Sequence, residues 1–160
     1  MLVKHNLLLN GGKLQSPVYM YARSNEETFI KDNKVYVNNL KTSAAGFTSI
    51  GMYEKNMSLD NNKTYYPGFF GRIDGDVDIY KGEYKPHKTK GNFNYIELKG
   101  DKVKNPLHIR SFNGANVILE RLCLFEGEIG DIFIPCIEDL PKEKQPLLPP
   151  EGNYKEITPL

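Results

Sequence analysis

Short runs of alternating apolar and polar residues, separated by turn-forming residues, most restrict how this 160-residue chain can fold. An alternation with a period of two places successive side chains on opposite faces of a strand, and it is clear at 34–37 and 76–80. The longest run, 116–125, is apolar on both faces, which is typical of a strand in the centre of a sandwich. No window carries the helical i, i+3, i+4, i+7 pattern over three turns without a cluster of Gly, Pro or Asn. The sequence therefore predicts an all-β chain.

Eight or nine short strands at regular spacing predict a two-sheet antiparallel β-sandwich of the jelly-roll type. The predicted strands are 18–22, 34–37, 47–53, 64–73, 76–80, 93–98, 107–112 and 116–125. The residues Asp60-Asn61-Asn62-Lys63 are a strong turn signal before the aromatic run at 64–73. Such a chain is long enough to form one core, and we assign the sandwich to residues 1–140.

The last twenty residues differ from the rest of the chain because five prolines crowd into them. We expect 141–160 to be extended, either as a disordered terminus or as an arm that docks on a neighbouring subunit or a larger assembly. A tail that is surrounded only by solvent gains no stability from apolar side chains. The candidate assembly contacts are therefore Leu147, Leu148, Tyr154, Ile157 and Leu160.

Charge and apolar content exclude several classes of protein. The 21 basic and 20 acidic residues give a net charge of +1, which excludes the strong basicity of a nucleic-acid binder. No segment has the pattern of a signal peptide, and the apolar stretch at 7–9 is too short to cross a membrane. We therefore expect synthesis in a cytoplasm and no membrane or nucleic-acid partner. Cys123 is predicted to be a buried small hydrophobe, and its pairing with Cys136 is left open.

A search for catalytic and metal-binding motifs gives no candidate set. His5, His87 and His108 lie in no metal-ligand spacing, and the chain has no G-x-S-x-G motif or Gly-rich phosphate loop. We therefore predict a protein that is not an enzyme and has neither a cofactor nor a catalytic or metal site. The acidic residues at 74–78 fit an ordinary hairpin or a calcium site, and those at 126–131 are a second candidate for structural calcium.

Tyrosines on an all-β scaffold raise the possibility of glycan binding, because carbohydrate sites combine flat rings with polar side chains. Packing in the core or at a sheet edge is the alternative for each ring. The absence of Trp removes the best stacking residue. The candidate glycan-binding residues are Tyr19, Tyr21, Arg72, Tyr80 and Tyr84.

Three segments carry a resemblance to a known family. The opening Asn6-Leu7-Leu8-Leu9-Asn10-Gly11-Gly12 and the turn Leu59-Asp60-Asn61-Asn62-Lys63-Thr64-Tyr65 resemble parts of the carbohydrate-binding-like jelly-roll domains of bacteriophage tail and virion proteins. The run from Ile118 to Gly127, followed by 130–139, resembles the closing strand and final segment of that family. Phe133 stands where that segment usually has Trp, and Asp131 stands where Thr is common.

This resemblance implies a galactose-binding-like jelly roll and a place in the virion after synthesis in the host cytoplasm. It implies a non-enzymatic structural or accessory protein of a tail, baseplate or head (capsid) fibre. Such a protein is held by contacts with other virion proteins, as a homo-oligomer or in several copies. The alternative is a host-attachment module that recognises a cell-wall polysaccharide.

Overall fold

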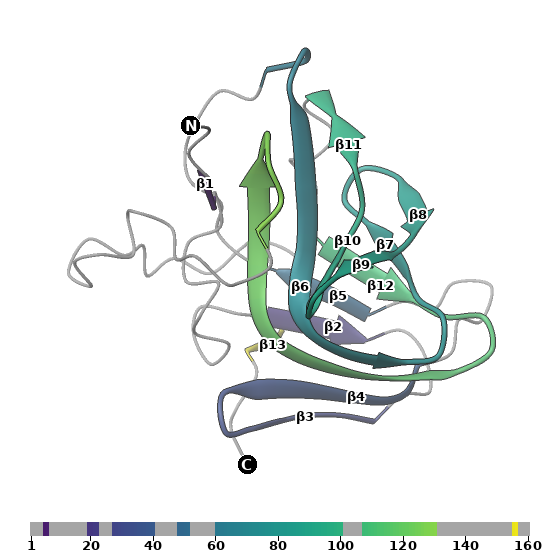
Figure 1. Cartoon of the computed structure of the whole chain (residues 1–160). Helices are drawn as coiled ribbons and strands as arrows, with labels where there is room; N and C mark the ends of the chain where they lie inside the picture. The colour runs from purple at the N-terminus through teal and green to yellow at the C-terminus, as the bar shows by residue number, and fades with distance from the viewer. Residues whose placement is uncertain are drawn as a thin grey trace.

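Regular secondary structure in the computed structural model consists of β-strands, with no α-helix in the ranges that it describes (Figure 1). Those ranges are residues 5–6, 19–22, 27–40, 48–51, 60–100, 107–130 and 155–156. Across the same ranges, no helix is long and apolar enough to cross a membrane.

The strands form two sheets, and every pairing within them is antiparallel. The first sheet has the order β3-β4-β13-β6-β10-β9, with β1 paired to β13 and β11 paired to β6. Its strands are β1 (His5–Asn6), β3 (Glu27–Lys31), β4 (Lys34–Leu40), β6 (Thr64–Asp74), β9 (Lys88–Lys90), β10 (Phe93–Tyr95), β11 (Leu98–Lys99) and β13 (Ala115–Glu126).

The second sheet has the order β14-β2-β5-β12-β7-β8. Its strands are β2 (Tyr19–Ala22), β5 (Thr48–Gly51), β7 (Asp78–Tyr80), β8 (Tyr84–Pro86), β12 (Leu107–Arg110) and β14 (Lys155–Glu156). β14 lies within the predicted tail and pairs with β2 of the same chain.

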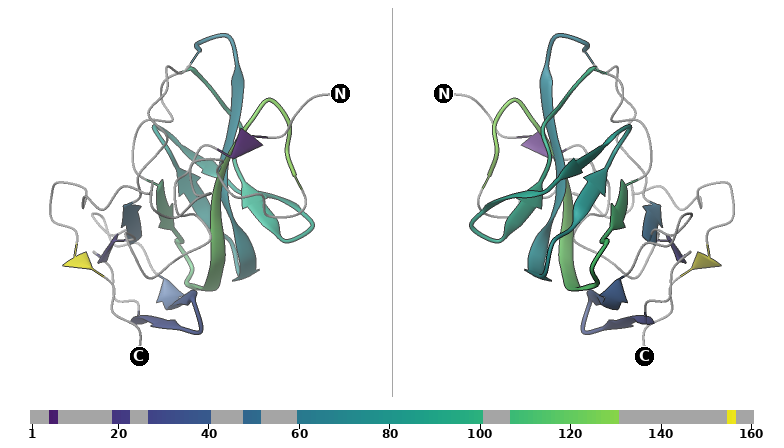
Figure 2. Two further views of the ribbon diagram at one scale, coloured as in Figure 1. Left: turned by 90° about the vertical axis from the view of Figure 1, so that its left-hand side faces the viewer. Right: turned by 90° about the vertical axis from the view of Figure 1, so that its right-hand side faces the viewer.

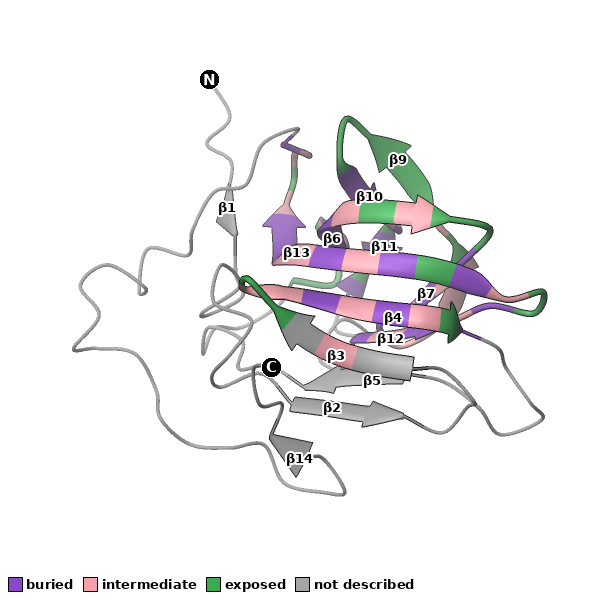
Figure 3. Cartoon of the chain, turned by 90° about the horizontal axis from the view of Figure 1, so that it is seen from below, coloured by how far each residue is buried: buried purple, intermediate pink, exposed green. Residues whose placement is uncertain are grey.

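The hydrophobic core lies between the two sheets. Val37, Phe69 and Leu119 of the first sheet and Ile79 and Ile109 of the second belong to one cluster of buried side chains. Figure 3 shows the resulting alternation of buried and more exposed positions along β4 and β13. Two antiparallel sheets packed on a shared core confirm the predicted β-sandwich.

The longest ladder joins β6 and β13, which run side by side in both views of Figure 2. Pro67 interrupts the pairing on the other side of β6. Its carbonyl still accepts a hydrogen bond from the Ile96 amide, but its ring nitrogen has no hydrogen to donate in return. β10 therefore ends at Tyr95, and the chain resumes pairing with β6 only at Leu98.

A second group of buried residues lies on the outer face of the first sheet. Phe70, Phe93, Cys123 and Phe125 are buried there, and Phe93 meets the Phe125 ring edge-on at 5.1 Å. The predicted burial of Cys123 is confirmed. Cys136 and most of 141–160 lie outside the described residues.

Candidate functional site

A group of aromatic and charged side chains occupies the outer face of the second sheet, where β8, β7 and β12 lie next to one another (Figure 1). Ile79, Leu107 and Ile109 point into the core. The alternation along a strand therefore directs the residues between them outward. We call this group the aromatic cluster, and it consists of Asp78, Tyr80, Tyr84, His108, Arg110 and Phe112.

Three rings of the aromatic cluster form a row across three strands. The backbone register pairs Tyr80 with Tyr84 on one side and with His108 on the other. The Tyr80 ring centroid lies 4.8 Å from that of Tyr84 and 4.9 Å from that of His108. Directly opposed side chains on one sheet face stabilise each other in this way, so contacts within the row hold the three rings in place.

Arg110 lies beside this row and is fixed from several directions. Its Nε donates a hydrogen bond to Asp78 Oδ2 at 3.1 Å. Its guanidinium carbon is 3.7 Å from the centroid of the Tyr84 ring and 4.9 Å from that of Phe112. A guanidinium oriented by a carboxylate and by aromatic faces loses little side-chain entropy when it binds a further partner.

Phe112 follows β12 and is the large hydrophobic side chain most open to solvent among the residues that the structure describes. It is 65% exposed, and no other large hydrophobic side chain in the described part of the chain is classed as exposed. Its ring lies beside the Arg110 guanidinium, so Phe112 extends the aromatic cluster beyond the end of β12.

Partial burial raises the pKa of the Tyr84 phenol above its ordinary value, and the nearby Arg110 cation opposes that shift. The hydroxyl therefore stays protonated at neutral pH and can donate a hydrogen bond. The aromatic cluster offers aromatic carbon, a cation, a carboxylate and neutral donors and acceptors within one surface.

The structure brings together two of the five predicted glycan-binding residues, Tyr80 and Tyr84. The backbone register continues their row through Ser49 to Tyr21 on β2, where Tyr19 also lies. Arg72 belongs to β6 in the other sheet, so it does not contribute to this surface.

Four members of the aromatic cluster were not among the predicted site residues: Asp78, His108, Arg110 and Phe112. The alternation at 107–110 could have shown that His108 and Arg110 share one face. It could not have shown that β12 lies beside β7, because that pairing joins residues about thirty positions apart. The predicted assembly contacts Leu147, Leu148, Tyr154, Ile157 and Leu160 lie outside the described residues.

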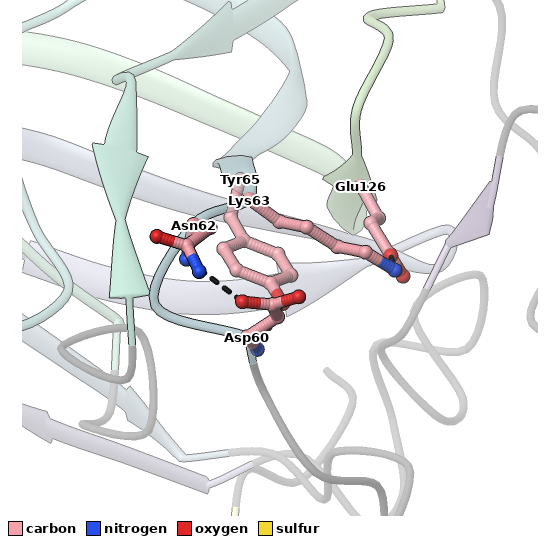
Figure 4. Close-up of polar contacts among 5 residues, drawn as sticks. All are labelled: Asp60, Asn62, Lys63, Tyr65 and Glu126. Atoms are coloured by element: carbon pink, nitrogen blue, oxygen red, sulfur yellow. Dashed lines mark hydrogen bonds and ion pairs between the residues drawn. The ribbon is translucent and has the colours of Figure 1, made fainter.

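The turn before β6 has a structural role (Figure 4). The Asp60 amide donates to the hydroxyl of the buried Tyr65 at 2.8 Å, and the Asn62 amide donates to Asp60 Oδ1 at 2.8 Å. Lys63 Nζ lies 2.5 Å from Glu126 Oε1 at the end of β13. These contacts fix the start of β6 against the end of its neighbouring strand.

Each of the two acidic segments considered for calcium has one carboxylate in an ion pair. Asp78 binds Arg110, and Glu126 binds Lys63. In the described residues, no three side chains of His, Cys, Asp or Glu lie close enough together to hold a metal ion.

Comparisons with known proteins give only distant structural likeness. No protein-family model matches the chain. No curated protein matches it either. A solved mutant of a family 29 carbohydrate-binding module is similar with a TM-score of 0.43 and 12% identity, over 86% of this chain and 94% of that one. A second mutant of that module, solved in complex with mannohexaose, has a TM-score of 0.42 and 10% identity, over 78% and 92% of the two chains.

Proposed function

We propose that this protein binds a saccharide on the aromatic cluster and catalyses no reaction. The observation that carries the proposal is the exposed Phe112 ring beside the fixed Arg110–Asp78 pair. Sugar-binding sites need an apolar ring against the C–H face of a pyranose and polar groups around it for the hydroxyls. The aromatic cluster supplies both.

The dimensions of the row also support a sugar ligand. Neighbouring strands are about 4.8 Å apart, so the row from Tyr84 to His108 is roughly 10 Å long. Two linked pyranose rings have a similar length. Because Arg110 and Asp78 form an ion pair, their charges cancel. This surface therefore favours a ligand rich in hydroxyl groups over a strongly charged one.

Affinity gel electrophoresis tests this proposal directly. The probes are glucomannan, mixed-linkage β-glucan, xylan and an extracted bacterial cell-wall polysaccharide, each cast into a native gel. We expect at least one polymer to retard the protein, and Phe112→Ala to be retarded clearly less than the wild type. Lys88→Ala, at an exposed position on β9, is the control and should migrate as the wild type does.

Two results would contradict the proposal. Wild-type protein that no polymer retards has no saccharide site of useful affinity. If Phe112→Ala is retarded as strongly as the wild type, the saccharide binds elsewhere on the molecule.

The biological setting that we propose is a bacteriophage particle, and the support for it is the sequence resemblance alone. There the protein would be a virion accessory protein that joins the host cell wall to the particle, with 141–160 as the attachment segment. Deletion of 141–160 should leave a folded, sugar-binding protein that no longer co-purifies with assembled particles. Normal incorporation of the truncated protein would count against this setting.

A further inference from the structure

The outer face of the first sheet carries a second row of aromatic, apolar and charged side chains. The register pairs Phe29 with Tyr36, Tyr36 with Ile118, and Ile118 with Arg72. These four residues therefore form one line across β3, β4, β13 and β6. Figure 3 shows this side of the sheet, with β4 and β13 towards the viewer.

The two rings at one end of the row pack on each other. Phe29 and Tyr36 lie nearly parallel, with an angle of 8° between the ring planes and 4.9 Å between their centroids. Both rings and Ile118 are half-buried. The residues beside them in sequence, Val35 and Val117, are buried in the core. The half-buried row is therefore not part of the sandwich interior.

The other end of this row is polar. Arg72 and Asp74 are both exposed and lie two residues apart on β6, so they share the outer face. Neither makes an ion pair or a side-chain hydrogen bond with another residue in the described ranges. Asn116 lies opposite Asp74, and its Oδ1 accepts a hydrogen bond from the Asn39 amide at 3.0 Å.

The chemistry of this surface selects one class of ligand. A cation and an anion side by side give no net charge, so neither a polyanion nor a polycation is favoured. Packed rings with exposed donors and acceptors at one end suit a neutral ligand that has an apolar face and many hydroxyl groups. With about 4.8 Å between strands, the row is roughly 14 Å long, similar to three linked pyranose rings.

We propose that Phe29, Tyr36, Ile118, Arg72 and Asp74 form a second saccharide-binding surface, which we call the Tyr36 surface. It lies on the opposite sheet from the aromatic cluster and has no residue in common with it. The protein is then bivalent for neutral polysaccharide chains and bridges two of them. This inference goes beyond the proposed function, which requires only the aromatic cluster.

Isothermal titration with the hexasaccharide of whichever panel polymer retards the protein tests the Tyr36 surface. Wild-type protein should bind two hexasaccharides per chain. Tyr36→Ala and Arg72→Ala should each weaken one of the two sites about tenfold or more, and Phe112→Ala should weaken the other. Arg72→Ala is the safer variant, because that side chain is exposed and contributes little to folding.

Each outcome separates the two proposals. Binding of a single hexasaccharide, lost in Phe112→Ala and unchanged in Arg72→Ala and Tyr36→Ala, overturns the Tyr36 surface and leaves the aromatic cluster supported. Binding of a single hexasaccharide that is lost in Arg72→Ala and kept in Phe112→Ala supports the Tyr36 surface and overturns the proposed function. No binding of any panel polymer or hexasaccharide overturns both.

Discussion

Replacing the exposed Phe112 ring offers the sharpest test of how the aromatic cluster holds its ligand. A phenylalanine side chain has about 200 Å² of surface, so 65% exposure leaves roughly 130 Å² for a partner. A sugar that stacks on one face covers about half of that, roughly 65 Å². At about 25 cal/mol per Å², this contact contributes about 1.6 kcal/mol.

That free energy corresponds to a roughly 15-fold increase in the dissociation constant of Phe112→Ala. Isothermal titration with a hexasaccharide measures it. The free energy of unfolding should change by less than about 0.5 kcal/mol, because the ring is exposed in the folded protein. Chemical denaturation of the same variant checks this second value.

Two matched variants separate the flat ring from its apolar area. Phe112→Tyr keeps the ring and should bind within about twofold of the wild type. Phe112→Leu keeps much of the apolar area without a flat face and should fall between the wild type and Phe112→Ala. If all three variants bind equally well, or if affinity and stability fall together, the stacking argument is wrong.

Three further predictions concern stability. Asn94→Ala should lower the free energy of unfolding by about 2–3 kcal/mol in urea titrations, because the buried amide donates to the carbonyls of Phe69, Gly71 and Asn92; a loss below about 0.5 kcal/mol would contradict this. Gly68→Ala should unfold the domain or lower its melting temperature by more than about 10 °C, because the added Cβ would overlap the Asn94 carbonyl oxygen. An unchanged melting temperature would be the contrary result. The raised pKa of Tyr84 means that its neutral form stabilises the fold below pH 10, and this contribution is lost as pH rises through the folded pKa. The wild type should therefore lose stability relative to Tyr84→Phe above pH 10; a constant difference between the two proteins would exclude this linkage.

Local sequence patterns were sufficient to predict the long strands. The predicted segments 64–73 and 116–125 correspond to β6, which is one residue longer at its end, and to β13, which is one residue longer at each end. Successive residues in these segments must occupy opposite faces, and their apolar content shows that both faces are covered. The turn at Asp32-Asn33 joins β3 to β4, and both residues have the positive φ angles of a tight hairpin.

Short polar strands were missed because neighbouring strands, and not their own residues, determine them. β9 consists of Lys88, Thr89 and Lys90, all exposed, and nothing in this composition favours a strand. It pairs with β10 through the hairpin at 91–92, and Thr89 hydrogen-bonds the buried Asn94. Lysines on this edge strand also discourage pairing with another chain.

The aromatic cluster, like the short polar strands, could be predicted only in part from the local sequence. Tyr80 and Tyr84 were predicted from their residue type alone, and the short turn between β7 and β8 places them opposite each other. His108 and Arg110 come from a strand whose position depends on the whole sheet order. Arg72 was grouped with the tyrosines by composition, but the sheet order places it on the other face of the molecule.

The β6–β13 ladder has a consequence for how the molecule opens. Its inward side chains belong to the core between the sheets, and its outward Phe70, Cys123 and Phe125 belong to the second buried group. Amide protons along these two strands should therefore exchange with solvent only through global unfolding, while those of the outer strands exchange through local fraying. The aromatic cluster has no residue on this slow-exchanging pair, whereas the Tyr36 surface takes Phe29 and Tyr36 from β3 and β4 and its other three residues from β6 and β13. Occupancy by a ligand should accordingly appear as increased amide protection at β3, β4, β7, β8 and β12, while the exchange rates within β6 and β13 report the stability of the whole domain.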